Sequence, residues 1–311
     1  ALDWKSRRNL AASQGAQRAQ IIHFDDGSDG RERGASQRAQ GQISRDFALK
    51  VPSPLVRFPL REENVTDIEK REERSLQEIE ALFVAHPNNI AGIILEPIQS
   101  EGGDNYFHTE FLKELRGLCD RHDSLLIFDE VHTGLTGTGQ WWDWQYHGVK
   151  PDLMVFGARA QVCGIALAQR VHESKGPIVS PGASLARFEG RLVDMMWCQR
   201  MIEIIEEDDL LSSAATMGDY LHKLVNDIPD IIPEISNIRG RGLWVTFDFP
   251  SAVERDKVVA ACFEEMLIVR PCGDSSIRIR PTLDVKADAI GRGIAQLEAA
   301  LCKTYGRRRP Q

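Results

Sequence analysis

The feature that most constrains the fold of this chain is a series of short, unbroken apolar runs with a helix-like segment between them. Ile90–Leu95, Leu125–Phe128 and Leu153–Phe156 are such runs, and Thr109–Arg121 has the apolar spacing of a helix. A strand that is buried on both faces of a sheet is apolar throughout, and parallel strands need long crossover connections. The pattern therefore predicts an α/β fold with a mainly parallel sheet covered on both faces by helices.

The segments on either side of this region differ from it in composition and in the pattern of their apolar residues. Residues 25–41 contain Gly, Ser, Gln and Arg with almost no apolar residues, which predicts a mobile loop. After residue 192 the sequence predicts a helix, a second helix, a strand, a helix, a strand and a final helix, over Val193–Glu206, Leu210–Asp227, Ile238–Phe249, Ala252–Met266, Ser276–Arg280 and Lys286–Cys302. This order is typical of a smaller α+β domain, so we expect a large domain over residues 1–192 and a small domain over residues 193–311.

The charge and the cysteines of the chain exclude several classes of protein. The 311 residues carry a formal net charge of -8, whereas a nucleic-acid surface needs a basic patch to contact phosphates. The six cysteines form no Cys-x-x-Cys pair, which argues against structural zinc and a disulfide framework and favours a reducing compartment. No apolar run reaches the roughly 18 residues of a membrane span. We therefore expect a cytoplasmic protein that binds no metal, no nucleic acid and no membrane.

Ligands of parallel sheets bind at the carboxyl ends of the strands, where this sequence places Glu96, Asp129 and Gly157. The strongest local signal is Asp129-Glu130-Val131-His132, which by itself looks like the magnesium-binding box of a helicase. That class of protein also needs a G-x-x-x-x-G-K-[ST] phosphate loop, and the chain contains none. Solvated acids at the end of a strand are the plainer alternative.

Several motifs occur together and in the same order as in a known family. They are Glu96–Asp104 (EPIQSEGGD), Asp129–Gly134 (DEVHTG), Phe156–Gly164 (FGARAQVCG), Arg239–Gly242 (RGRG) and Arg278–Pro281 (RIRP). Together they resemble the class III, ornithine-type aminotransferases, and the nearest branch looks like the lysine ε-aminotransferases and 4-aminobutyrate aminotransferases. The resemblance implies the large domain of a type I pyridoxal-phosphate enzyme with a C-terminal α+β small domain. It also implies a homodimer with its sites at the subunit interface.

The resemblance assigns a role to several residues. In the family, the aspartate that matches Asp129 pairs with the protonated pyridine nitrogen of pyridoxal phosphate, and His132 takes the position of a residue near the phenolic oxygen. The arginine that matches Arg280 binds the substrate carboxylate through its forked guanidinium, and the glutamate that matches Glu101 pairs with that arginine. An ordinary arginine at a sheet edge is the alternative for Arg280.

The sequence departs from the family at positions that hold the cofactor. The Schiff-base lysine matches Ala158 and is followed by Arg159, whose guanidinium stays protonated and is no amine nucleophile. Arg187 stands where a threonine contacts the cofactor phosphate, and Ser28 and Asp29 stand at the positions of the ring-stacking aromatic residue and its histidine neighbour. The family's phosphate-binding glycine-serine loop would lie upstream of this sequence.

We therefore expect no cofactor to bind with intact affinity, although the parent family uses pyridoxal phosphate. The leading hypothesis is a repurposed enzyme that is independent of this cofactor, for example one that catalyses a cyclisation or a condensation in a biosynthetic pathway. Asp129, His132 and Glu101 would be its acid–base groups, and a small carboxylate or amino-acid-like molecule would be its ligand. Two alternatives stay open: a non-catalytic binding or regulatory homologue, and a genuine lysine- or 4-aminobutyrate-type transaminase with an altered sequence.

Overall fold

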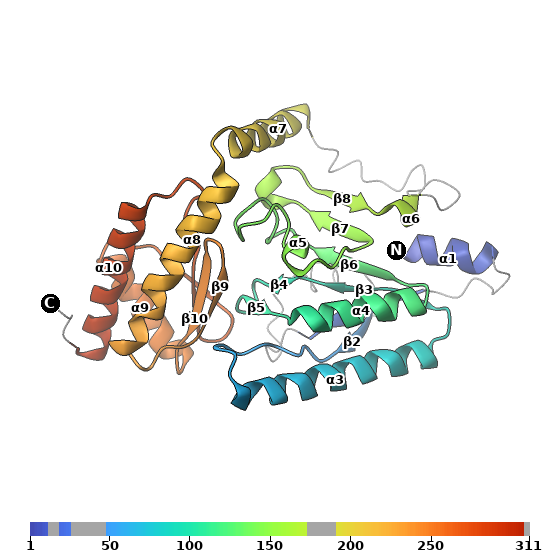
Figure 1. Ribbon diagram of the computed structural model, residues 1–311, viewed down its shortest axis with the longest axis horizontal. Helices are drawn as coiled ribbons and strands as arrows, with labels where there is room; N and C mark the ends of the chain where they lie inside the picture. Colours follow the sequence, from blue (N-terminus) through green and yellow to red (C-terminus); the bar gives the residue numbers. More distant parts are fainter. Residues whose placement is uncertain (12–18, 26–47, 173–190, 308–311) are drawn as a thin grey trace.

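A six-stranded sheet forms the centre of the larger part of the molecule (Figure 1). The computed structural model describes residues 1–11, 19–25, 48–172 and 191–307. The strands follow the order β2-β1-β3-β6-β7-β8 and are β1 (Gln20–Phe24), β2 (Ala48–Val51), β3 (Ile90–Leu95), β6 (Leu125–Asp129), β7 (Leu153–Phe156) and β8 (Gly164–Leu167). All neighbouring pairs are parallel except β7 and β8. The prediction of a mainly parallel sheet is confirmed, with an antiparallel edge strand added.

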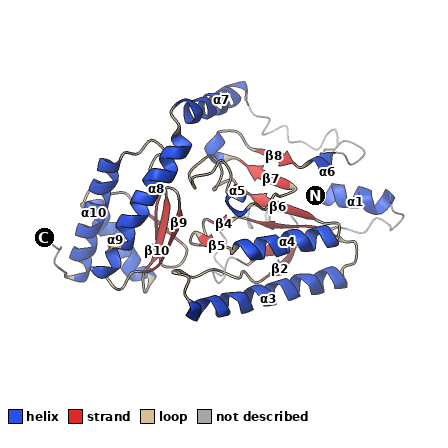
Figure 2. Cartoon of the chain, in the orientation of Figure 1, coloured by secondary structure: helices blue, strands red, loops and turns tan. Residues whose placement is uncertain are grey.

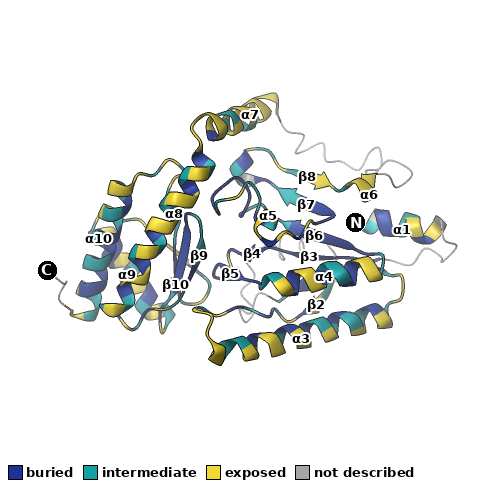
Figure 3. Ribbon diagram, viewed as in Figure 1, coloured by how far each residue is buried: buried dark blue, intermediate teal, exposed yellow. Residues whose placement is uncertain are grey.

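Helices cover both faces of this sheet (Figure 2). The helices concerned are α1 (Leu2–Ala11), α3 (Glu62–Ala85), α4 (Thr109–Arg121) and α6 (Gln169–His172). Because successive side chains of a strand point to opposite faces, the side chains of β6 contribute to two separate hydrophobic clusters, one on each face of the sheet. Phe128 packs into the cluster that also holds residues of α3 and α4, whereas Ile127 packs against Trp4 of α1 and Val171 of α6. The outward sides of α3 and α4 are exposed (Figure 3).

A second, antiparallel sheet lies in the C-terminal part of the chain, with the strand order β11-β12-β10-β9. Its strands are β9 (Ser236–Arg241), β10 (Trp244–Asp248), β11 (Arg270–Cys272) and β12 (Ser276–Ile279), and the helices of this part are α7 (Leu192–Glu207), α8 (Leu210–Asn226), α9 (Ala252–Glu264) and α10 (Ala287–Tyr305). Phe247 of β10, Val258 of α9 and Leu297 of α10 are fully buried in one hydrophobic cluster. This α+β arrangement agrees with the predicted fold class.

The single strand predicted over Ile238–Phe249 is instead the hairpin of β9 and β10. Arg241 pairs with Trp244, so only two residues make the turn between the strands. Gly242 in this turn has φ 55°, a left-handed conformation that glycine adopts without steric cost. The segment Arg239–Gly242 contains only Arg and Gly and leads directly into the apolar residues after Gly242, so the hydrophobicity pattern did not mark the reversal.

A short hairpin of β4 (Ile98–Gln99) and β5 (Asn105–Tyr106) follows β3 and reaches toward the second sheet (Figure 1). The mobile loop predicted over residues 25–41 lies, from residue 26 onward, outside the described residues. Within the described ranges no helix is long and apolar enough to cross a membrane. All six cysteines are free thiols, and four of them are buried.

Candidate functional site

Three arginines of the second sheet point at the loop between β4 and β5. Arg239 on β9 and Arg278 on β12 both lie opposite Thr246 of β10, so the three side chains share one face of the sheet. Arg280 follows Arg278 by two residues and therefore returns to the same face. Arg239 donates to the main-chain oxygens of Asp104 (3.0 Å) and Gly103, and Arg278 donates to the Ser100 oxygen (2.7 Å). We call Arg239, Arg278 and Arg280, with Ser100 and Asp104, the arginine cluster.

Asp104 is the carboxylate at the centre of the arginine cluster. It is 1% exposed, accepts a hydrogen bond from the Thr246 hydroxyl (2.6 Å) and forms a short ion pair with the Arg280 guanidinium. The Ser100 hydroxyl oxygen accepts from Arg278 (3.0 Å) and from Arg280 (3.1 Å). Burial lowers the pKa of Arg280, and Asp104 opposes that effect. The Arg280 guanidinium also lies 3.4 Å from the ring centre of Trp244, a cation–π contact.

The structure corrects the expected pairing of Glu101 with Arg280. Glu101 forms an ion pair with Arg278 (Nη1 to Oε1, 3.3 Å), and Asp104 forms the ion pair with Arg280. Glu101 is 46% exposed, so the fully buried Asp104 offers the stronger electrostatic partner in a medium of lower dielectric constant. In the sequence, Asp104 is only the last residue of the Glu96–Asp104 motif. Its position in a turn after Gly103 was the one available signal.

Asp129 lies at the carboxyl edge of the parallel sheet, as the strand-end rule predicts, and His132 follows it in the turn after β6. Asp129 ends β6, and its Oδ1 accepts a hydrogen bond from the Val131 amide (3.1 Å). Val155 of β7 pairs with Asp129, so the 3₁₀ turn η2 (Ala158–Ala160) after β7 begins at the same edge. Arg187, Ser28 and Asp29 lie outside the described residues.

Glu130 turns away from this edge into the protein. Its carboxylate accepts hydrogen bonds from the Thr133 hydroxyl (2.5 Å) and from the amides of Asp143 and Trp144 (2.8 Å each). Burial, followed by the charge of Asp143, raises the pKa of Glu130 to about 7. The residue thus fixes the loop after β6 over the short helix α5 (Trp144–His147).

Trp244 and Arg159 are site residues whose contacts sequence reasoning did not foresee. The Arg159 guanidinium lies 5.4 Å from the ring centre of Trp244, on which Arg280 also stacks. Burial, followed by the charge of Arg280, lowers the pKa of Arg159 to about 10, so the side chain remains a cation at neutral pH. Sequence reasoning considered Arg159 only as a failed substitute for a lysine.

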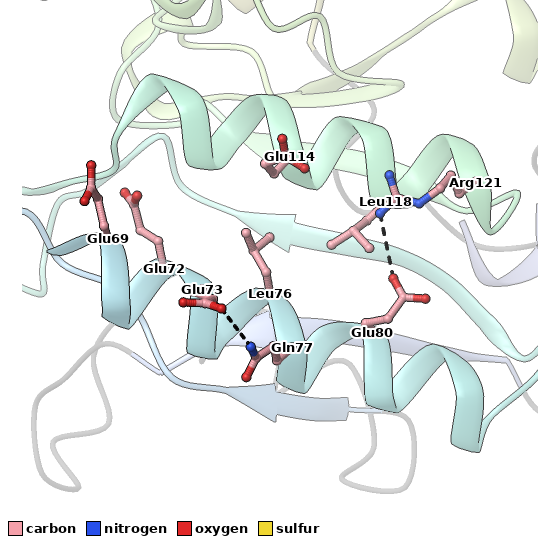
Figure 4. Close-up of a pocket in the computed structure, with 9 residues that line it drawn as sticks. All are labelled: Glu69, Glu72, Glu73, Leu76, Gln77, Glu80, Glu114, Leu118 and Arg121. Atoms are coloured by element: carbon pink, nitrogen blue, oxygen red, sulfur yellow. Dashed lines mark hydrogen bonds and ion pairs between the residues drawn. The ribbon is translucent and has the colours of Figure 1, made fainter. Parts of the chain in front are cut away.

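A groove on another part of the surface has the opposite charge (Figure 4). It has a volume of about 450 Å³ between α3 and α4, and its acidic lining residues are Glu69, Glu72, Glu73, Glu80 and Glu114. Burial raises the pKa of Glu72, and the charge of His108 opposes that effect. This lining repels a carboxylate ligand, so the arginine cluster is the better carboxylate site.

The mainly parallel sheet with one antiparallel edge strand, followed by a second α+β unit, is the fold of the type I pyridoxal-phosphate enzymes. The chain belongs to the class-III aminotransferase family, whose model matches residues 4–301. The resemblance drawn from the motifs is thereby confirmed.

The relatives fall in the predicted branch of that family. L-lysine-epsilon aminotransferase of Amycolatopsis lactamdurans is 33% identical over 310 residues, which cover 97% of this chain and 69% of that protein. Mitochondrial 4-aminobutyrate aminotransferase of Mus musculus is 34% identical over 239 residues, or 75% of this chain and 47% of the relative. The solved structure of a lysine aminotransferase from M. tuberculosis in the internal aldimine form has a TM-score of 0.85 and 32% identity, and the match covers 97% of this chain and 71% of that chain.

Proposed function

We propose that this protein binds a small carboxylate of the amino-acid type at Arg280 and does so without covalent attachment of pyridoxal phosphate at residue 158. The observation that carries the proposal is the segment Phe156–Ala160, which contains no lysine although the arginine cluster next to the strand ends is complete. The protein is, on this proposal, a class III member repurposed for chemistry that does not need the family's lysine.

The charges of the arginine cluster support carboxylate binding. Arg278 and Arg280 are both largely buried, and their guanidiniums converge on Ser100, whose hydroxyl oxygen accepts from each of them. A forked guanidinium can bind a carboxylate through two parallel hydrogen bonds. Asp104 holds Arg280 in place until a ligand carboxylate takes over part of that contact.

The residues at the strand ends fit the family cofactor only in part. Asp129 stands where a carboxylate can stabilise a protonated ring nitrogen, and when bound the cofactor would supply an electron-accepting ring. Covalent attachment needs an amine, which alanine at position 158 lacks and which the protonated guanidinium of Arg159 cannot replace. This donor set fits non-covalent contact with the ring and does not fit the family's covalent bond.

The acid–base groups of the proposed reaction are Asp129, His132 and Glu101. A carboxylate or an imidazole near a bound ligand can move a proton, and Glu101 is half-exposed at the mouth of the arginine cluster. Glu130 is excluded from this role because three donors already occupy its carboxylate.

The test combines ligand binding with a chemical trap. We expect 4-aminobutyrate or lysine to bind the protein in calorimetric titration without added pyridoxal phosphate. Arg280→Met should weaken that binding by about tenfold or more, since a charged hydrogen bond is worth about 1.5 to 3 kcal/mol. Arg74→Met, which removes an exposed guanidinium paired with Glu78 on α3, serves as the matched control and should leave binding unchanged.

The same protein is incubated with pyridoxal phosphate, reduced with borohydride and mapped by peptide mass spectrometry. We expect no cofactor adduct on a lysine near the strand ends. An adduct there would overturn the proposal and favour a genuine transaminase.

We also propose that the protein forms a homodimer through α7. Leu192, Met195, Met196 and Trp197 of this helix are each more than half exposed, which is unusual for large apolar side chains spaced three and four residues apart. A contiguous exposed apolar patch of this kind marks a protein–protein contact.

A further inference from the structure

We propose that a cavity beside the arginine cluster binds a second type of ligand, a short-chain monocarboxylate, with its carboxylate on Arg159 and the Trp244 indole. The cavity is formed by η2, the loop after β6, α7, and the loop after β12. The inference rests on Arg159 and Trp244 rather than on the proposed role of Arg280, so each can fail without the other.

Arg159 is a largely buried cation that lacks an acceptor. Within the described ranges no hydrogen bond or ion pair reaches its guanidinium, and its nearest charged neighbour of the same sign is Arg280. Taking a guanidinium out of water is costly unless an anion compensates it. Arg280 is paired directly with Asp104, whereas the charge of Asp104 reaches Arg159 only at longer range and forms no ion pair with it. A bound anion is the simplest completion of this arrangement.

The Trp244 indole provides a second unused donor at the same place. Its Nε1 is buried and has no hydrogen-bond partner among the described residues. Nε1 lies 2.8 Å from the point where a side chain at Gly137 would begin, and Arg159 Nη1 borders the same point. The missing side chain at residue 137 therefore lets the two donors converge. Nearly all buried polar groups in proteins are hydrogen-bonded, so two unpaired donors side by side indicate a missing acceptor.

The remaining walls of the cavity are mostly apolar, with Thr282 as a further polar side chain among its lining residues. Leu135, Met201, Ile205 and Leu283 line it, and no aspartate or glutamate of the described chain is among its lining residues. The volume is about 200 Å³, below the roughly 300 to 1,000 Å³ of sites for drug-sized ligands. A carboxylate with a short alkyl tail matches both ends of this cavity. An amino acid does not, because its ammonium group would be buried against aliphatic side chains.

The cavity is distinct from the carboxylate site at Arg280. Arg280 contacts the Trp244 ring but is not among the lining residues of the cavity, and its guanidinium is held by Asp104 and Ser100. The ring of Trp244 thus lies between an arginine with a direct anionic partner, Arg280, and one without such a partner among the described residues, Arg159.

The experiment is calorimetric titration of the full chain with hexanoate, 6-aminohexanoate and inorganic phosphate. We expect hexanoate to bind at one site. 6-Aminohexanoate should bind that site at least about tenfold more weakly, because its ammonium group replaces the apolar end of hexanoate. Phosphate should also bind at least about tenfold more weakly, because it has no alkyl tail. Arg159→Met should weaken hexanoate binding by about tenfold or more. Trp244→Phe, which keeps an aromatic ring and removes the Nε1 donor, should weaken it by roughly threefold to tenfold.

The variants also separate binding from folding. Arg159→Met should keep or raise the melting temperature of the ligand-free protein, because it removes a largely buried cation that has no direct anionic partner among the described residues. Arg74→Met is the control and should leave hexanoate affinity unchanged. The proposal is overturned if hexanoate does not bind, if phosphate binds as tightly, or if Arg159→Met folds and keeps full affinity. Loss of 4-aminobutyrate binding with hexanoate binding intact would instead overturn the proposed function at Arg280.

Discussion

Glu130 follows Asp129 directly, yet the two carboxylates have opposite environments. Asp129 ends β6 at the ligand edge of the sheet, whereas Glu130 is buried under the loop that it holds through three hydrogen bonds. The strand-end rule predicted the position of Asp129. It could not predict Asp104, because the role of that residue depends on its meeting Arg280, 176 positions further along the chain.

Glu130 also predicts a pH dependence of stability. Its pKa in the fold is about 7, against an ordinary value of 4.5, because burial disfavours the charged form. The folded protein therefore holds a proton that the unfolded chain has released between about pH 4.5 and 7. The stability contributed by protonated Glu130 is full below that window and is lost as the pH rises through it.

Glu130→Gln should flatten this part of the profile. The measurement is the melting temperature between pH 5 and pH 8 for the wild type, for Glu130→Gln, and for the surface control Glu110→Gln. We expect the decline of the wild type to be smaller in Glu130→Gln and unchanged in the control. Identical slopes in all three proteins would contradict the assignment.

At the scale of secondary structure, the sequence predicted the middle of the chain closely and the N-terminal region poorly. The bounds of β3, α4 and β7 agree with the predicted segments, because unbroken apolar runs and a strong helical period leave few alternatives. β1 and β2 were missed. Their sequences are short and contain Gln, His and Lys, so pairing with β3 and with each other, rather than intrinsic preference, makes them strands.

The helix starts give a prediction at this scale. Ser251 caps α9 by accepting a hydrogen bond from the Glu254 amide (3.3 Å), whereas Lys286 at the start of α10 provides no side-chain cap. Ser251→Ala should lower the free energy of unfolding by about 1 kcal/mol, and Lys286→Ser should raise it by a similar amount.

Urea denaturation of the purified variants measures both changes. Lys286→Ala is the matched control, since it removes the same lysine without adding an acceptor. If Lys286→Ser and Lys286→Ala are equally stable, the hydrogen bonds that the Asp288 carboxylate accepts from the Asp288 and Ala289 amides already satisfy the start of α10.

For the whole molecule, one large hydrophobic cluster holds buried residues between 22 and 149, and another holds buried residues between 221 and 302. The division at residues 192 and 193 remains a prediction, which this separation supports. α7 begins at that point, and its exposed apolar side chains are the proposed dimer contact.

Trp197→Glu should convert a dimer into monomers, because a charge in the centre of an apolar contact would be buried without a partner. Sedimentation velocity measures the change. Phe263→Glu on α9 is the control, since Phe263 is just as apolar and is 71% exposed. A wild-type monomer, or a dimer that survives Trp197→Glu and dissociates with Phe263→Glu, would refute the assignment to α7.

The arginine cluster has a consequence for the heat capacity of the protein. It joins the second sheet to the β4–β5 hairpin mainly through charges and hydrogen bonds, with Trp244, Ile98 and Tyr106 as a small apolar contact. Exposure of apolar surface raises the heat capacity, whereas exposure of polar surface lowers it. If this contact opened while both hydrophobic cores stayed intact, the heat capacity of the protein would therefore change little. Such an opening would expose Arg280 to a ligand while it left little trace in the heat capacity.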